Sequence, residues 1–318
     1  MRKVTLDSVK DCDRIFSNGE YVILSGKNPW IFRQDGTFVA KLKTIRHAYV
    51  VVFLPQNTAL LNGGGSDKYY HYVSLCDGQI LWSCPKSGRR DLGGNPLTVS
   101  PGGQTAYCVY SINQVLHVDI ITPKENRCVT YSIPLGIRAT YHSYCDVEGN
   151  LYFLQSFAEN LPRDYDEEDH SYYINGVLKW SPSLSEPVWV QQWSTPPRAG
   201  RTLKKCNEEY VLFDNFTVRS FKTGEEFNLL ENEPKHSRSP GGFRCAYDRE
   251  RSLLTVNFTS SCSTVVIDCK MRKIVAHYVP ISPGLNSGCL IGDEFWIGTR
   301  DGVIKRPFPH MDEFPRRL

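Results

Sequence analysis

Residues 47–55 read HAYVVVFLP, and three further runs follow at 58–64 (TALLNGG), 69–78 (YYHYVSLCDG) and 79–85 (QILWSCP). Each run has the length of a β-strand and is rich in β-branched, aromatic or other apolar residues. Gly, Pro, Asn and Asp stand between the runs, where a chain that reverses direction needs turn-forming residues. The stretch therefore predicts four consecutive β-strands joined by short turns.

The same arrangement recurs along the chain, most clearly in residues 95–134 and 242–280. The first strand of each unit is expected near Asp11, His47, Asn95, Ala139, Ala199, Gly241 and Gly284. Four-stranded blades of β-propellers repeat about every 40–50 residues. Only the fourth unit is clearly longer. The spacing predicts an all-β fold, a seven-bladed β-propeller that spans residues 1–318 as a single domain.

Other fold classes explain the pattern less well. No stretch of the chain repeats apolar residues at the helical spacing, and 19 prolines and 24 glycines punctuate it throughout. A fold of alternating helices and strands is therefore not expected. A two-sheet sandwich remains open, although it would not account for seven similar units.

The two ends of the chain predict how such a ring closes. The seventh unit offers three strands, at 288–294, 295–300 and 302–308, whereas residues 1–8 form an additional apolar and polar run before the first unit. We expect residues 1–8 to complete the last blade, because a closed ring leaves only short sheet edges exposed.

Several hairpins resemble those of a known superfamily. Residues 30–39, 73–82 and 219–227 each place a Gly turn between the third and fourth strands of a unit, and residues 295–304 resemble its second and third strands. The chain in this respect resembles the WD-repeat and quinoprotein-like β-propellers. No unit contains the Trp-Asp or Gly-His pair of strict WD repeats. A quinone cofactor is not implied, and we expect no cofactor.

Composition limits the classes of partner. Hydrophobic residues make up 41% of the chain and charged residues 22%, which is typical of a globular protein. The formal net charge of +3 gives no support to binding of nucleic acid or an anionic membrane. No secretory signal or membrane-spanning run is recognisable. The 11 cysteines contain no Cys-x-x-Cys pair, so neither a disulfide framework nor a zinc site is expected, and a cytoplasmic location is predicted.

Arginines recur near the beginning of the first strand in five of the seven units. First strands of a propeller surround its central channel, so these side chains are candidate ligands for a carboxylate, a phosphate or an acidic peptide at the channel mouth. Ordinary pairing between neighbouring blades is the alternative. The residues are Arg14, Arg46, Arg138, Arg201 and Arg244.

An acidic insertion in the fourth unit, residues 159–170, is a second candidate binding element. It lacks the glycine turn and ligand spacing of a calcium loop. A solvated loop is one interpretation, and a docking site for a basic protein partner is the other. The candidate partner-binding residues are Tyr165, Asp166, Glu167, Glu168 and Asp169.

Signatures of catalysis are weak. The sequence has no His-x-His or His-Glu-x-x-His spacing for a metal, and no Gly-x-Ser-x-Gly nucleophile elbow. A phosphate-binding loop requires a helix directly after its glycines, and no helical pattern follows the glycines at 63–65. We therefore expect a non-enzymatic platform for protein interactions, with no metal. The alternative is a propeller hydrolase or lactonase that acts on a small anionic sugar-derived substrate in the axial pocket.

Overall fold

The computed structural model describes residues 5–63, 67–86, 97–112, 115–134, 138–156, 172–192, 198–199, 204–205, 210–212, 216–220, 223, 225–231, 243–248, 250–258, 263–278 and 287–310. Within these ranges the chain is almost entirely β-structure, with two short 3-10 helices, η1 (Leu6–Ser8) and η2 (Pro123–Glu125). No helix in the described part is long and apolar enough to cross a membrane.

The described strands form seven antiparallel sheets, numbered here in chain order. In sheets 1 to 3, four consecutive strands pair each with the next. Sheet 1 contains β1 (Arg14–Ser17), β2 (Tyr21–Ser25), β3 (Trp30–Arg33) and β4 (Phe38–Lys41). Sheet 2 contains β5 (Ala48–Leu54), β6 (Thr58–Gly63), β7 (Tyr69–Ser74) and β8 (Ile80–Pro85). Sheet 3 contains β9 (Leu97–Val99), β10 (Ala106–Ile112), β11 (Val115–Thr122) and β12 (Arg127–Pro134).

Sheets 4 to 7 follow the same order. Sheet 4 contains β13 (Arg138–Cys145), β14 (Leu151–Ser156), β15 (Tyr172–Trp180) and β16 (Val188–Gln192), and β17 (Arg198–Ala199) also pairs with β15. Sheet 5 contains β18 (Lys204–Lys205), β19 (Tyr210–Leu212), β20 (Thr217–Ser220) and β21 (Glu226–Asn228). Sheet 6 contains β22 (Phe243–Asp248), β23 (Leu253–Phe258), β24 (Thr264–Asp268) and β25 (Lys273–Tyr278). Sheet 7 contains β26 (Ser287–Ile291), β27 (Glu294–Gly298) and β28 (Val303–Pro307).

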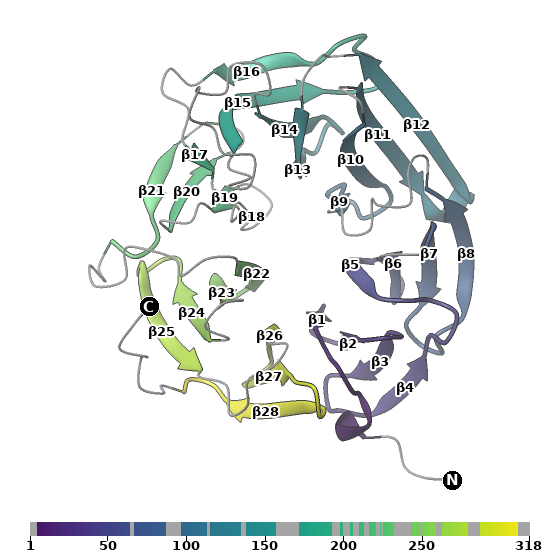
Figure 1. Cartoon of the computed structure of the whole chain (residues 1–318), viewed down its shortest axis with the longest axis vertical. Helices are drawn as coiled ribbons and strands as arrows, with labels where there is room; N and C mark the ends of the chain where they lie inside the picture. Colours follow the sequence, from purple (N-terminus) through teal and green to yellow (C-terminus); the bar gives the residue numbers. More distant parts are fainter. Residues whose placement is uncertain are drawn as a thin grey trace.

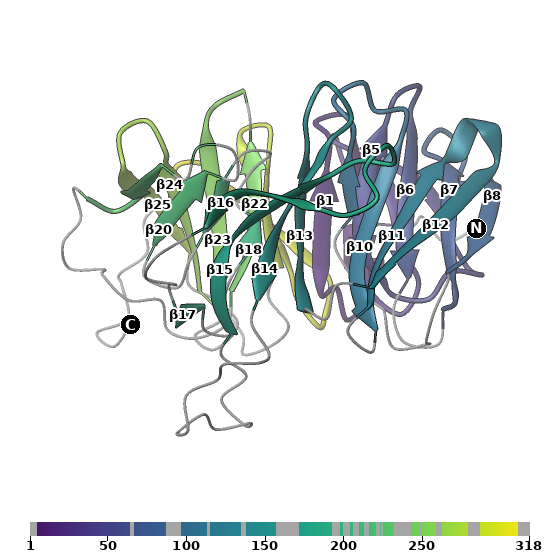
Figure 2. The same ribbon diagram turned by 90° about the horizontal axis from the view of Figure 1, so that it is seen from above.

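The sheets stand around a central axis, with the first strand of each nearest the axis and the last strand at the rim (Figure 1). Seen from the side, the strands run across the thickness of a disc (Figure 2). Because neighbouring strands are antiparallel, the turns between second and third strands lie at the same end of the sheets as the links from one sheet to the next. We call this end the linker face. The remaining turns form the opposite face.

The hairpin between β7 and β8 illustrates how local sequence sets this geometry. Its turn contains Asp77 and Gly78, and the Asp77 carboxylate accepts a hydrogen bond from the backbone N–H of Gln79 at 3.0 Å. Gly78 has a φ of +74°, which favours glycine, and a Cβ there would lie 2.3 Å from that of Ala40 in sheet 1. A larger residue would therefore strain the turn and collide with the neighbouring sheet. The sequence predicted this hairpin correctly.

Apolar side chains fill the space between neighbouring sheets. Ile31 of sheet 1 packs with Leu61 of sheet 2, and Leu60 on the other face of sheet 2 packs with Tyr110 of sheet 3. Further layers join sheets 3 and 4, 5 and 6, 6 and 7, and 7 and 1. Burying each such aliphatic side chain contributes about 1.5–3 kcal/mol, so these layers are the main source of stability.

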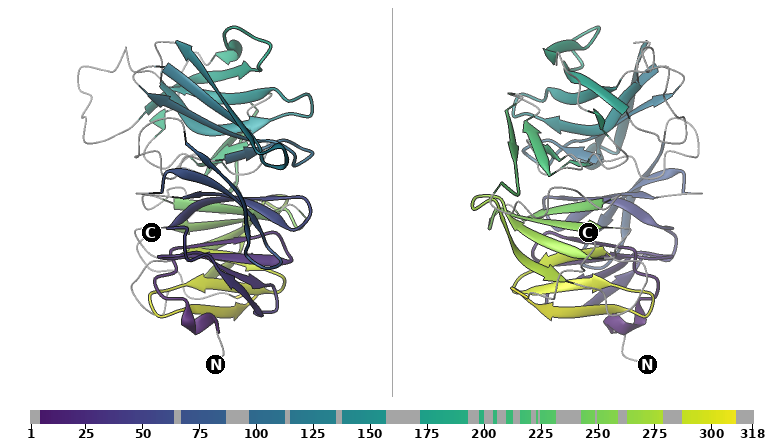
Figure 3. Two further views of the ribbon diagram at one scale, coloured as in Figure 1. Left: turned by 90° about the vertical axis from the view of Figure 1, so that its right-hand side faces the viewer. Right: turned by 60° about the vertical axis from the view of Figure 1, so that its left-hand side comes forward.

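The first and last sheets lie side by side, which Figures 1 and 3 show from different directions. The backbone N–H groups of Asp11 and Cys12 donate to the carbonyls of Arg300 and Thr299, at 3.0 and 3.1 Å. The backbone N–H of Ile15 in β1 donates to Ser287 Oγ of β26 at 2.8 Å. These contacts tie the N-terminal region to the C-terminal sheet.

The expectation that residues 1–8 form a strand of the last blade is wrong for Leu6–Ser8, which form the 3-10 helix η1. The Ser8 N–H donates to the Thr5 carbonyl at 2.9 Å, while the Thr5 N–H donates to Ser8 Oγ at 3.2 Å. These reciprocal bonds close a turn and prevent the extended conformation that a ladder needs. Residues 1–4 lie outside the described residues.

Candidate functional site

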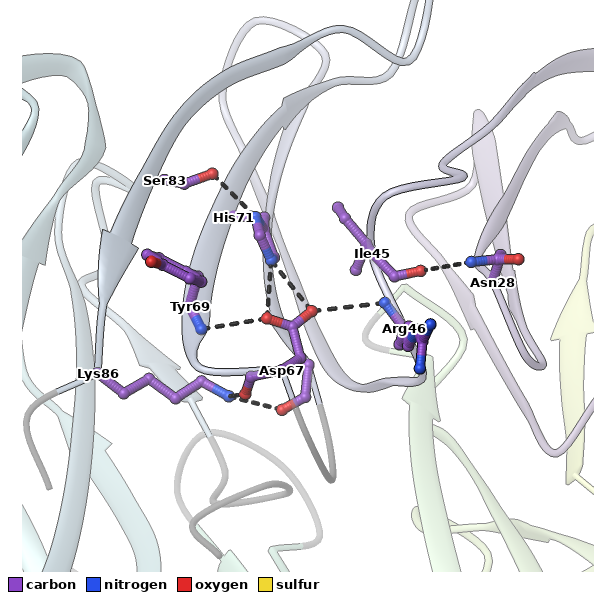
Figure 4. Close-up of polar contacts among 9 residues, drawn as sticks. Asn28, Ile45, Arg46, Asp67, Tyr69, His71, Ser83 and Lys86 are labelled. Carbon is purple, nitrogen blue, oxygen red and sulfur yellow. Dashed lines mark hydrogen bonds and ion pairs between the residues drawn. The ribbon is translucent and has the colours of Figure 1, made fainter. Parts of the chain in front are cut away.

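A cleft of about 740 Å³ opens between sheets 1 and 2 on the linker face. One wall is the link from β4 to β5, and the other consists of the start of β7 and of side chains from β8 (Figure 4). The cleft is open to solvent and combines basic, hydroxyl and aromatic groups. Its lining residues are Thr44, Arg46, Asp67, Lys68, Tyr69, His71, Ile80 and Ser83.

The Asp67 carboxylate holds the two walls together. It lies 3.0 and 3.1 Å from His71 Nε2, and it accepts hydrogen bonds from the backbone N–H groups of Tyr69 at 3.1 Å and Arg46 at 3.4 Å. Burial would raise the pKa of Asp67, but the hydrogen bonds and attraction from His71 and the two backbone donors outweigh this effect and lower it. Asp67 is therefore an anion that fixes both the histidine and the neighbouring link.

His71 connects this carboxylate to a serine. Its Nδ1 lies 2.9 Å from Ser83 Oγ, which belongs to the directly opposite residue of β8. The side chains of His71 and Asp67 are only 9% and 7% exposed. In the neutral imidazole that donates Nε2–H to Asp67, Nδ1 is the acceptor for the Ser83 hydroxyl. The three residues form a carboxylate–imidazole–hydroxyl relay that ends at an exposed serine.

Lys86 supports the base of the cleft. Its ammonium donates to the carbonyls of Gly63 at 2.6 Å and Asp67 at 3.0 Å, which holds the turn between β6 and β7 (Figure 4). Burial lowers the pKa of Lys86, and the nearby Asp67 carboxylate opposes that shift. A Cβ at Gly63 would lie 2.5 Å from Asp67 Oδ2, so glycine is required for this close approach. Gly63 and Asp67 are consequently held close together at the base of the cleft.

A second side chain fixes the adjoining turns. Asn28 Nδ2 donates to the carbonyls of Lys43 at 3.1 Å and Ile45 at 2.9 Å. The turn between β2 and β3 is thereby bonded to the link from β4 to β5, which Asp67 bonds in turn to sheet 2. Side-chain hydrogen bonds thus connect three consecutive segments of the linker face.

Exposed basic side chains project from these connected segments. No ion pair involving them is found within the described ranges. Tyr69, which is 45% exposed, lies beside them in the cleft. We call this set the linker-face basic patch. It consists of Lys27, Lys43, Arg46 and Lys68.

The opposite face has a different character. A smaller cleft of about 480 Å³ lies there between sheets 1 and 7, and it is lined by Glu20, Asp35, Asp293 and Glu294 together with Arg33. Lys305 already pairs with Glu294 at 2.9 Å. In the described part of the chain, no group of three or more His, Cys, Asp or Glu side chains is arranged to hold a metal ion.

A buried polar cluster joins sheets 2 and 3. The fully buried Asp119 accepts hydrogen bonds from the hydroxyls of Tyr70 at 2.8 Å, Thr130 at 2.7 Å and Tyr110 at 3.2 Å. Burial first, and then the neighbouring Cys108 and Asp119, raise the pKa of Tyr70 above its ordinary value. The phenol therefore remains a donor, and the cluster serves to join the sheets.

The structure describes two of the candidate arginine side chains. Arg14 begins β1 and bonds through Nη1 to the Tyr49 carbonyl of β5, with its guanidinium 4.8 Å from the Tyr49 ring centroid. Arg46 lines the cleft. These two side chains have different neighbours, and Arg14 links the first strands of sheets 1 and 2.

The remaining candidate residues are described less fully. Arg138 begins β13 and Arg244 lies in β22, both first strands of their sheets, but only the backbone at these positions is described. Arg201 lies outside the described residues, as do Tyr165, Asp166, Glu167, Glu168 and Asp169. Their predicted roles in ligand and partner binding therefore stay predictions.

The Asp67–His71–Ser83 relay is absent from the sequence-based predictions. The Asp-Gly turn at 77–78 predicts the hairpin, but the pairing of His71 with Ser83 also depends on a register shift between Tyr72 and Val73 that the sequence does not specify. The return of Asp67 onto His71 depends on the path of the turn that follows β6, and no spacing rule specifies that path.

Comparison with known proteins shows the fold. The WD40 domain of Neurospora crassa Pan2 superposes with a TM-score of 0.57, covering 96% of this chain and 90% of that chain at 10% identity. The fold is that of a β-propeller. Hydrazine synthase of Kuenenia stuttgartiensis is a more distant match, with a TM-score of 0.44, 13% identity, and coverage of 91% of this chain and 81% of that one. No family model and no curated protein matches the propeller's sequence.

Proposed function

We propose that this propeller is a protein-interaction platform that binds acidic segments of a partner protein on its linker face. The observation that carries the proposal is the linker-face basic patch, whose side chains project from turns already bonded to one another. A surface held in place before binding loses little conformational entropy when a partner docks. Opposite charge on the partner would accelerate association and fix its orientation.

The cleft adds specificity to this surface. Tyr69 offers an exposed aromatic ring beside Arg46 and Lys68, and aromatic and arginine side chains are the residue types that most often anchor protein interfaces. Carboxylates of an acidic segment would meet the cations, while its apolar portion would pack on the ring. We propose no cofactor or metal for this function.

Several sequence-based expectations belong to the same proposal. We propose that the seven sheets are blades of one closed propeller domain, which the contacts between sheets 1 and 7 support. Such a ring would bring the first-strand arginines to the channel mouth on the linker face. Residues 165–169 fall in sequence between β14 and β15, and we propose that they contact basic groups of the same partner. The described cysteines form no disulfide with one another, which supports the proposal of a reducing cytoplasmic location.

The test is a titration of the protein with a fluorescein-labelled Glu-rich peptide, followed by anisotropy at low and physiological salt. The double substitution Arg46→Glu and Lys68→Glu should weaken binding at least about tenfold, because it replaces attraction with repulsion. Added salt should weaken wild-type binding as well.

The matched control reverses two cations on the opposite face, Lys124→Glu and Lys270→Glu, so that the net charge changes equally. This control should bind within about twofold of the wild type. If both double variants bound the peptide equally weakly, its affinity would depend on net charge alone, and this would contradict a binding surface at the linker face.

A further inference from the structure

The geometry points to Ser83 as an activated nucleophile, and we infer that the cleft hydrolyses small anionic carboxylic esters. The relay that supports this reaction is continuous: Asp67 Oδ1 to His71 Nε2 is 3.0 Å, and His71 Nδ1 to Ser83 Oγ is 2.9 Å. A carboxylate, an imidazole and a hydroxyl in hydrogen-bonded sequence are the elements of nucleophilic catalysis by serine, and they are identified by geometry instead of chain order.

The protonation pattern favours transfer from the serine. In the neutral tautomer that donates Nε2–H to Asp67, the lone pair on Nδ1 faces the Ser83 hydroxyl. When Nδ1 takes the serine proton, the imidazolium lies against a carboxylate whose pKa is already lowered. Asp67 acts as a positioning residue, because it touches His71 and not the reacting serine.

The surroundings of Ser83 set the class of substrate. The serine is exposed and lines the cleft together with Arg46, Lys68 and Tyr69. The two cations attract an anionic substrate into the cleft, because opposite charge raises its local concentration there. A carboxylic ester bearing a second carboxylate fits this arrangement, with its alkyl portion against Ile80.

The chemical steps balance with water as the only co-reactant. Ser83 Oγ forms a bond to the ester carbonyl carbon as its proton passes to His71 Nδ1. The carbon–oxygen bond to the alcohol breaks, and the alcohol leaves with that proton. Water then attacks the acyl-serine, giving up a proton through His71 to Ser83 Oγ, which releases the carboxylic acid and restores the serine.

The chain contains its own reference serine. In sheet 3, Ser132 Oγ lies 2.9 Å from His117 Nδ1, and the two residues are directly opposite in β12 and β11. Both serines are exposed, so a reagent can reach either of them. The two residues that precede β11 in the sequence, 113–114, are Asn and Gln, so neither supplies a carboxylate to correspond to Asp67. Reactivity that depends on the whole relay should therefore distinguish Ser83 from Ser132.

The experiment treats the full chain with a fluorophosphonate probe and locates modified serines by mass spectrometry. Ser83 Oγ displaces fluoride from phosphorus, and its proton leaves through His71 to solvent. We expect Ser83 to react about 100-fold faster than Ser132 in the same molecules, because only His71 is fixed as a general base by a carboxylate. Because both sites are in one wild-type sample, this readout requires no variant to fold. Equal modification of the two serines, or of neither, would overturn the inference.

Variants then separate reaction from structure. Ser83→Ala and His71→Gln should abolish the modification and the hydrolysis of a monoester of a dicarboxylic acid, whereas Ser132→Ala should retain both. Asp67→Asn should slow the modification at least about tenfold, and Asp67→Glu should recover part of the rate. Unchanged modification of Ser83 in a folded His71→Gln protein would also refute the relay. The reaction requires no acidic partner, so its outcome is independent of peptide binding.

Discussion

Sheets 2 and 3 contain the same histidine–serine pair in two different settings. His71 and His117 are each the third residue of the third strand, and each hydrogen-bonds through Nδ1 to a serine directly across on the fourth strand at 2.9 Å. His71 is buried and has a carboxylate on its other nitrogen, whereas His117 is partly exposed and stacks on Tyr110 at 5.2 Å. Sheets 2 and 3 share the pair, and the partner of the histidine distinguishes them.

The connection before the third strand explains the difference. In sheet 2, β6 ends at Gly63 and β7 begins at Tyr69, which leaves room for the chain to bring Asp67 back onto His71. In sheet 3, β10 ends at Ile112 and β11 begins at Val115. In sheet 3 the comparable carboxylate, Asp119, lies within β11 itself and accepts a hydrogen bond from Tyr70 of sheet 2. One carboxylate therefore shapes an open cleft, while the other is a buried tie.

The largest expected effect is at the buried tie. Asp119→Ala would leave the hydroxyls of Tyr70, Tyr110 and Thr130 without their common acceptor, and we expect a loss of about 3 kcal/mol or more in the free energy of unfolding. Chemical denaturation measures this loss. Asp119→Asn keeps one acceptor oxygen and should lose less. Equal stability of the Ala variant and the wild type would show that Asp119 does not join the sheets.

A smaller loss is expected at the cleft. Asp67→Ala removes the acceptor of His71 and of two backbone N–H groups near the surface, so unfolding should become easier by about 1–3 kcal/mol. If Asp67→Ala lowered the free energy of unfolding more than Asp119→Ala, the buried Asp119 would not be the more stabilising of the two carboxylates.

The contribution of Asp67 should also depend on pH. Its pKa in the folded protein lies below the ordinary value of 3.8, so its stabilising effect is fully present above that value and disappears as the pH falls through the folded-state pKa. The stability difference between the wild type and Asp67→Asn should therefore shrink in acid. A difference that grows as the pH falls would contradict a depressed pKa.

The smallest effects are expected at the two serines. Ser83→Ala and Ser132→Ala each remove one exposed hydroxyl, and each should change the free energy of unfolding by less than about 1 kcal/mol. Thermal unfolding of the two variants in parallel checks this. A much larger loss at Ser83 would show that its bond to His71 maintains the fold, and would weaken the case for a chemical role.

Much of the fold follows from the sequence because the period of the pattern is local. Runs such as YYHYVSLCDG at 69–78 specify a strand and the turn that follows it. The glycine of that turn also allows the close contact with Ala40 of sheet 1. The prediction of a strand at the N-terminus was wrong for Leu6–Ser8 because Thr5 and Ser8 hydrogen-bond to each other. Such local hydrogen bonds compete with strand pairing and cannot be recognised from the hydrophobic pattern.

The site was harder to foresee because it joins segments from different sheets. Arg46 was selected for its position near a first strand, yet its neighbours in the cleft include Ile80 and Ser83 of β8, at the rim. Asn28 and Asp67 act by bonding to backbone groups of another segment, and such contacts leave no periodic signal. Only the arrangement in space reveals that their basic neighbours form one surface.

Hydrogen–deuterium exchange with and without the Glu-rich peptide tests the binding surface most directly. Bound peptide should slow exchange in residues 42–47 and 67–70, which carry Lys43, Arg46, Lys68 and Tyr69 on the linker face. Slowed exchange confined to opposite-face turns such as 34–37 and 123–126, or no change anywhere under saturating peptide, would contradict the account.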